Sequence, residues 1–302
     1  MLISGIAMLL VLLGIGFAPG APLLMFAVLM LGTAASSFDV GMNSVAAHHE
    51  KITGRSMMSM LHACACGGGL AGAALGSAMA SLNLSPAMHF LLLALPLAVV
   101  LGLGHAGIIS GCGEQIQKKS FVLPRGPLAL LGTLGFLGSV AEGSIADWSG
   151  IFLHDHFGAS AGVVPLSLTV FSAMMLVARL FGDRLKMRHG ARALICSGGL
   201  IAAAGLFFAV FAPEARFALL GFALAGGGLS LVFPFVFSAA GKEGPAALAG
   251  VATMAYSGAL MGPPLLGSIA QAVGMQGAMG VVATLGLLIA QLATRTALLD
   301  SH

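Results

Sequence analysis

Apolar stretches of about twenty residues follow one another along almost the whole chain. A helix needs about 20 mostly apolar residues to cross the ~30 Å hydrocarbon core of a bilayer. Breaks at Gly, Pro and charged clusters divide the chain into about ten such segments. They cover residues 2–18, 22–46, 57–81, 87–109, 126–147, 160–181, 191–211, 216–239, 247–270 and 276–296. The pattern predicts an all-α, polytopic membrane protein.

Composition supports this prediction and excludes several other classes of protein. The chain has 302 residues, of which 58% are hydrophobic and 8% are charged, and its mean hydropathy is +1.03. Soluble domains carry roughly 25% charged residues. So few charges cannot cover a water-exposed surface of this size. A soluble enzyme, a disordered chain and a nucleic-acid-binding protein are therefore poor interpretations.

Basic residues lie mainly on one side of the predicted spans. The loops on one side hold Arg216 alone, and those on the other side hold Lys51, Arg55, Lys118, Lys119, Arg125, Arg184, Lys186, Arg188, Arg192, Lys242 and Arg295. Cytoplasmic loops of membrane proteins are enriched in Lys and Arg. This asymmetry predicts a multi-pass protein with both termini in the cytoplasm.

A shift of 191 residues superimposes several landmarks of the chain. Lys51 falls on Lys242, and Leu75-Gly76-Ser77 falls on Leu266-Gly267-Ser268. Predicted helices and loops keep the same phase throughout this shift. Structural repeats of this kind are typical of secondary transporters.

One segment then points to a family. The stretch Gly182-Asp183-Arg184-Leu185-Lys186-Met187-Arg188-His189-Gly190 resembles the signature loop of the major facilitator superfamily, Gly-x-x-x-Asp-Arg-x-Gly-Arg-Arg. The Asp-Arg pair and the trailing basic residues match, and the central glycine of the family pattern is replaced. The segment follows the second predicted helix of the second half, where the resemblance requires it.

Two further stretches resemble a bacterial inner-membrane subgroup of that superfamily, similar to fucose permeases and to the membrane protein of rhizopine gene clusters. They are Phe38–Asn43 and Ala141–Ser149, and Gly262-Pro263-Pro264 also fits the subgroup. The resemblance implies a helical bundle of four plus six spans in the bacterial inner membrane.

The repeat also predicts a deficit. Shifted by 191 residues, the signature would end directly before Met1, so the first half is expected to lack roughly 66 residues, or two helices, relative to a twelve-helix facilitator. We therefore expect a truncated N-terminal half over 1–110, a cytoplasmic linker over 111–124 and a six-helix half over 125–302.

Ionisable side chains inside the spans are candidates for function, because each costs up to about 3 kcal/mol on insertion scales and needs a partner or a watery cavity. Asp39 and His62 lie at similar depth on consecutive predicted helices, and Asn43 lies one turn from Asp39. They are predicted to bind a proton or a solute hydroxyl. The alternative is a buried polar pair that joins two helices.

Further candidates lie in the second half. Glu142 is expected in the outer third of its span, which the resemblance makes a cavity-lining helix, and we predict a substrate or proton role for it. Asp147 and Trp148 are expected at the outer boundary, as a gate or an anchor. The cluster His154, Asp155 and His156 is interpreted as a solvated outer loop and not as a metal site.

The signature segment and its neighbour are predicted to form a gate. Arg179, Gly182, Asp183, Arg184 and Arg188 lie at or near the cytoplasmic end of one helix. Their charges can pair with acids or helix termini of adjoining helices and release them during transport. The alternative is that these cations only anchor the protein by the positive-inside rule.

Together these features predict a secondary active transporter of a small polar solute such as a sugar or cyclitol, working by alternating access and coupled to protons as a symporter. The alternative is a truncated, transport-inactive remnant with a structural or regulatory role. We expect a monomer in the lipid bilayer that is not an enzyme and has no cofactor, no metal and no nucleic-acid partner.

Overall fold

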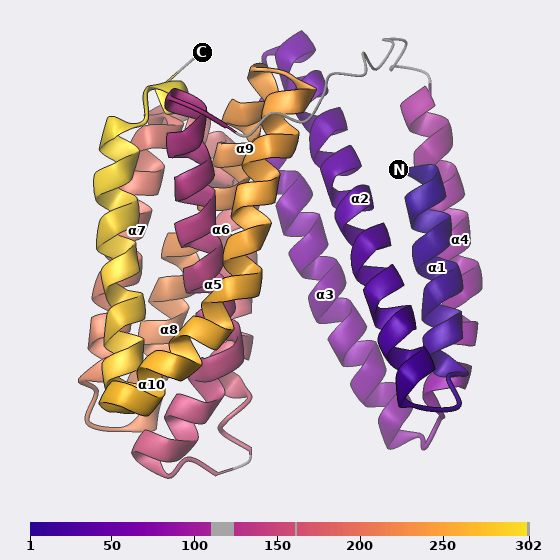
Figure 1. Cartoon of the computed structure of the whole chain (residues 1–302), viewed down its shortest axis with the longest axis horizontal. Coiled ribbons are helices and arrows are strands. Elements are labelled where there is room, and N and C mark those ends of the chain that lie inside the picture. The colour runs from indigo at the N-terminus through magenta and orange to yellow at the C-terminus, as the bar shows by residue number, and fades with distance from the viewer. Residues whose placement is uncertain (110–123, 161, 301–302) are drawn as a thin grey trace. The chain divides into compact units, whose positions relative to one another are not determined.

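The computed structural model describes residues 1–109, 124–160 and 162–300. The expected linker over 111–124 lies outside the described residues except for Pro124. The described residues form α-helices joined by short turns (Figure 1). The helices are α1 Leu2–Gly16, α2 Ala21–Thr53, α3 Met58–Ser81, α4 Pro86–Ile109, α5 Pro127–Phe157, α6 Leu166–His189, α7 Ala191–Val210, α8 Ala215–Leu229, α9 Val232–Lys242 and α10 Pro245–Arg295, followed by the 3-10 helix η1 Ala297–Asp300.

The ten predicted spans correspond to these helices. Eight helical stretches of the described residues are long and apolar enough to cross a membrane, with α8 and α9 counted as one, and α1 is a shorter apolar helix of 15 residues. α10 contains two spans, because Gly274 has φ 77° and reverses the chain inside it. Figure 1 shows α10 crossing the bundle and returning. The predicted all-α membrane fold is confirmed.

Some helix ends differ from the predicted boundaries. α2 extends to Thr53, α5 to Phe157 and α6 to His189. The prediction ended these helices at polar residues, but polar residues continue a helix once it leaves the hydrocarbon core. The stretch expected as a signature loop therefore forms the last turns of α6, and His154, Asp155 and His156 lie on α5 and not in a loop.

Contacts divide the chain into two units. Unit 1 contains Met1–Val45 and Gly68–Lys119, and unit 2 contains Ala46–Gly67 and Ser120–His302. The end of α2 and the beginning of α3 thus pack with the second half of the chain. The expected N-terminal half over 1–110, linker over 111–124 and six-helix half over 125–302 stay a prediction.

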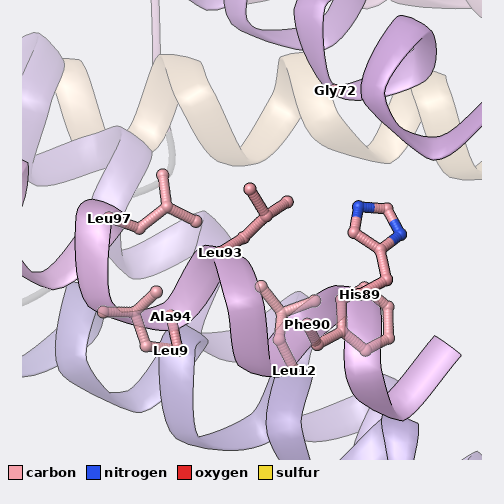
Figure 2. A pocket seen from close by; sticks show the side chains of 8 residues that line it. All are labelled: Leu9, Leu12, Gly72, His89, Phe90, Leu93, Ala94 and Leu97. Carbon is pink, nitrogen blue, oxygen red and sulfur yellow. The ribbon is translucent and has the colours of Figure 1, made fainter. Parts of the chain in front are cut away.

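In unit 1, α1 packs along α4 (Figure 1). Small residues bring these two helices together: a Cβ on Gly5 would lie 2.6 Å from a methyl carbon of Leu101, and one on Gly16 would lie 2.8 Å from Cα of Ala87. A cavity of about 180 Å³ lies beside this contact, and Figure 2 shows the side chains that line it. It is lined by Leu9, Leu12, Gly72, His89, Phe90, Leu93, Ala94 and Leu97. The lining is apolar except for His89.

Unit 2 is held together by close contacts between helix backbones. A Cβ on Gly205 of α7 would lie 2.7 Å from the carbonyl oxygen of Gly221 on α8, and one on Gly199 would lie 2.6 Å from that of Gly286 on α10. Lipid offers no hydrophobic drive for helices to associate, so close packing of small residues provides much of the stability. The glycines of these spans thus set the distances between α7, α8 and α10.

We predict that Gly205→Ala lowers the thermal stability of the protein in detergent. The added methyl group has no space between α7 and α8, and overpacking of this kind costs about 1–3 kcal/mol. Gly227→Ala is the matched control, because its Cβ would meet no atom within 4 Å. Since Ala is a better helix former than Gly by up to ~1 kcal/mol, the control should be neutral or stabilising. Equal losses of melting temperature for the two variants would contradict this account of the packing.

Candidate functional site

A break in one membrane span lies at the centre of the site. α8 ends at Leu229 and α9 begins at Val232. Pro234 has no N–H group, so it cannot donate the helical hydrogen bond to the carbonyl oxygen of Ser230 four residues earlier. Nε of Arg179 donates to that oxygen instead, at 2.9 Å. The Ser230 hydroxyl in turn donates to the carbonyl oxygen of Gly227 at 2.6 Å. The break therefore persists because side chains replace the lost backbone partners.

Arg179 also links two further helices, α3 and α5, to this break. It lies on α6 and is 5% exposed. Its Nη1 donates to Sγ of Cys66 on α3. Its Nη2 lies 3.8 Å from Oε2 of Glu142 on α5, which is an ion pair but too long for a hydrogen bond. The backbone oxygen of Arg179 accepts from the hydroxyl of Ser59 at 2.8 Å.

Glu142 is the acid of this arrangement. Its Oε2 is buried and has no hydrogen-bond partner among the described residues. Buried carboxylate oxygens are nearly always hydrogen-bonded, which makes Glu142 a candidate for binding a proton or a solute. The sequence grouped Arg179 with the gate and Glu142 with the substrate, and the structure brings the two together.

A second group of side chains surrounds the N-terminus of α3. Oε1 of Glu50 accepts from the amides of Met57 and Met58, at 2.8 Å each. Asp183 accepts from the amide of Ser59 at 3.0 Å and from that of Met60 at 2.8 Å. The first four amides of a helix have no partner within the helix. Here two carboxylates bind all four and also oppose the positive end of the helix dipole.

The same two carboxylates are joined to each other and to a lysine. The hydroxyl of Ser56 donates to Asp183 at 2.7 Å and to Glu50 at 3.3 Å. Nζ of Lys186 lies 3.7 Å from Oε2 of Glu50 and donates to the hydroxyl of Ser238 at 2.6 Å, and that hydroxyl donates to Glu50. We call Glu50, Ser56, Asp183, Lys186 and Ser238 the α3 cluster.

Gly182 allows this cluster to form. A Cβ at Gly182 would collide with the side chains of Ser59 and Leu231. The first glycine of the signature is therefore a point where α3 and α9 approach α6 closely. Arg184 and Arg188 of the same segment are exposed, so among its basic residues Lys186 takes part in the α3 cluster and these two arginines do not.

Four members of the α3 cluster were absent from the sequence prediction. Glu50 and Ser56 fall between two predicted spans and Ser238 falls inside one, while Lys186 belongs to the signature segment, whose charges were expected to pair with adjoining helices, but was not named as a site residue. One signal was available: Lys186 lies three residues after Asp183 and so shares its helix face. The partners on α2, α3 and α9 are more than fifty residues away, and local spacing does not reveal them.

The remaining predicted residues are placed as follows. Asn43 donates its side-chain amide to the backbone oxygen of Asp39 at 2.9 Å, within α2. Asp39 belongs to unit 1 and His62 to unit 2, so their predicted pairing stays a prediction. The ring of His62 lies 6.0 Å from that of Phe237, which lies 6.1 Å from that of Tyr256.

At the far end of α5, Asp147 is exposed, and a Cβ on Gly267 would lie 3.0 Å from the indole of Trp148. His154 pairs with Asp155 at 2.9 Å in an exposed position. No group of three or more His, Cys, Asp or Glu side chains in the part of the chain that the structure describes has a metal-binding arrangement.

A bundle of apolar helices with a broken span and a buried ion pair between two helices is found in membrane transporters, and comparisons with known proteins support this class. No family model matches the chain. It is 36% identical to an uncharacterised MFS-type transporter of Yersinia pestis over 87% of this chain and 70% of that protein. It is 33% identical to an uncharacterised transporter of Sinorhizobium fredii, over 92% and 76%. It is 30% identical to the membrane protein MosC of Rhizobium meliloti, over 90% and 68%.

Solved structures show the same fold. The fucose:proton symporter FucP of E. coli superimposes with a TM-score of 0.76 at 15% identity, over 98% of this chain and 82% of that one. The human organic anion transporter MFSD10 does so with a TM-score of 0.74 at 16% identity, over 97% and 76%. The chain belongs to the major facilitator superfamily. It is a multi-pass membrane transporter and not an enzyme.

The substitution of Pro234 tests the role of Arg179 at the break. In a Glu142→Gln background, Arg179→Met should destabilise the protein by leaving the Ser230 carbonyl unpaired, at a cost of about 1–3 kcal/mol. Adding Pro234→Ala restores an N–H donor and should recover a large part of that loss in thermal unfolding. In the Glu142→Gln protein that keeps Arg179, Pro234→Ala should increase the thermal stability by a smaller amount. The prediction is wrong if Pro234→Ala has the same effect with and without Arg179, because the two groups then act independently.

Proposed function

We propose that the protein is a secondary active transporter of a small polar solute, such as a sugar or cyclitol, and that transport is coupled to protons. The observation that carries the coupling is the Glu142–Arg179 pair inside the membrane, with its orphaned carboxylate oxygen. An intramembrane carboxylate is stable in two forms, paired with a cation or protonated. Exchange between these forms gives a mechanism for carrying a proton.

In this proposal the proton and the solute bind to the same pair of side chains. Glu142 holds the proton, and its protonation leaves Arg179 able to bind an oxygen of the solute. Asp39, Asn43 and His62 are further candidates for binding a proton or a solute hydroxyl, Asp39 and Asn43 within unit 1 and His62 within unit 2.

The α3 cluster is proposed as the gate. Its carboxylates bind amides at the start of α3, and the chain passes from one unit to the other within α2 and again within α3. Breaking and remaking these bonds would allow residues 1–110 and 125–302 to move as two halves in alternating access. Arg184 and Arg188 would then only fix the orientation of the protein in the membrane, by the positive-inside rule. With the basic residues in the cytoplasm, both termini of a bacterial inner-membrane protein lie inside.

Proteoliposomes test the coupling. The protein is reconstituted with a pH-sensitive dye inside, and L-fucose, D-glucose and myo-inositol are offered in turn. We expect uptake of at least one solute to be accelerated by an inward proton gradient and to acidify the interior of the liposomes, which the dye reports. Glu142→Gln should abolish the response to the gradient, because the amide cannot exchange a proton, while residual exchange of the solute continues.

Asp155→Asn is the matched control, since this exposed carboxylate lies on the same helix as Glu142. Its uptake should equal that of the unchanged protein. Solute flux that ignores the gradient and survives both Glu142→Gln and Asp39→Asn would rule out the coupling. Absence of any flux for all solutes would favour the alternative of a transport-inactive membrane protein.

The gate is tested by the reactivity of Cys66, with Cys64, Cys112 and Cys196 replaced by Ser. Asp183→Asn keeps an acceptor oxygen but removes the charge from the α3 N-terminus, a loss of about 1 kcal/mol. We expect roughly fivefold faster labelling of Cys66 by a maleimide, as the start of α3 detaches more often. Asp155→Asn should leave the labelling rate unchanged. An unchanged rate for Asp183→Asn would argue against the gate.

A further inference from the structure

A shallow groove lies within unit 2 between α5 and the second half of α10. Its volume is about 170 Å³, and its lining residues are Leu137, Leu288, Gln291, Leu292 and Arg295. The α10 residues recur every three or four positions, so they form one stripe along the helix. Leu288 is 46% exposed. The groove is therefore an open surface feature of the membrane-spanning bundle.

The polarity of the groove changes along its length. Arg295 is the last residue of α10, and Leu288 lies seven residues earlier, roughly 10 Å along the helix axis. Gln291 lies about one turn before Arg295 and adds amide donors near the same end. The groove thus changes from apolar in the span to cationic at the helix end, which matches the order of acyl chain and phosphate in a phospholipid.

The charge at the mouth of the groove is available for a ligand. Arg192, also at this end of the unit, pairs with Asp300 at 2.7 Å and donates to the carbonyl oxygen of Thr296. Arg295 forms no ion pair with any acid in the described part of the chain. One arginine is therefore neutralised by the C-terminal segment, while the other leaves its positive charge exposed beside an apolar groove.

We propose that this groove binds an anionic phospholipid of the surrounding membrane. An acyl chain lies against Leu137, Leu288 and Leu292, and the headgroup phosphate accepts hydrogen bonds from Arg295 and Gln291. Basic residues at the end of a membrane span attract anionic headgroups, and an arginine forms charge-assisted hydrogen bonds with a phosphate. The proposal is independent of solute transport, since none of these residues belongs to the site described above.

Lipid binding to the purified full chain in detergent tests the proposal. Phosphatidylglycerol and phosphatidylcholine with identical acyl chains are titrated separately, and binding is followed by native mass spectrometry and by melting temperature. We expect tighter binding and a larger rise in melting temperature with phosphatidylglycerol. Arg295→Gln should reduce the preference for phosphatidylglycerol by about fivefold, the effect of one basic residue near anionic lipid, and Arg295→Lys should retain most of it.

Two further variants separate the parts of the groove. Leu288→Trp fills its apolar part and should weaken binding of both lipids by a similar factor. Arg216→Gln removes an exposed arginine that is paired with Glu214, outside the groove, and should leave the preference unchanged. An unaltered preference in Arg295→Gln, or an equal rise in melting temperature with inorganic phosphate alone, would overturn the proposal.

Discussion

The hydrogen bond from Arg179 to the carbonyl oxygen of Ser230 is the contact around which unit 2 is organised. The hydrocarbon core offers no water to a backbone group that leaves the helical pattern, so every break in a span needs an internal partner. Pro234 creates such a break, and a buried arginine fills it. The cation must then itself be balanced, and this places Glu142 beside it. A defect in one helix thus accounts for an ion pair between two others.

The N-terminus of α3 follows the same rule. Four amides that begin a helix are bound by Glu50 and Asp183, which come from α2 and α6. Carboxylates at a helix N-terminus are favoured both by direct hydrogen bonds and by the helix dipole. Because these bonds join separate helices, they are suited to hold one conformation and to release it. Stability and the proposed gating share one set of contacts.

The small number of charges makes each pairing informative. Charged residues within a span are expensive, so those that remain are paired or lie where a ligand can complete them. Lys186 is balanced by Glu50, and Arg192 by Asp300. Glu142 forms only a long ion pair, with no hydrogen bond to Oε2. Arg295 has no acid partner among the described residues. Glu142 is the proposed site of a proton, and Arg295 is the proposed site of a lipid headgroup. The two sites use the same physical principle at different depths in the membrane.

Hydropathy along the chain was sufficient to predict the helices, the approximate span boundaries and the membrane class, because transfer from water to lipid is a local property of about twenty residues. The signature residues Gly182 and Asp183 were also identifiable, as were Glu142 and Arg179 as costly charges. Their partners were not. Glu50, Ser56 and Ser238 are unremarkable in sequence, and the pairing of Arg179 with Glu142 and with the Ser230 carbonyl joins residues 37 and 51 positions apart. Which polar groups meet depends on how helices pack against one another, and only the tertiary structure decided that.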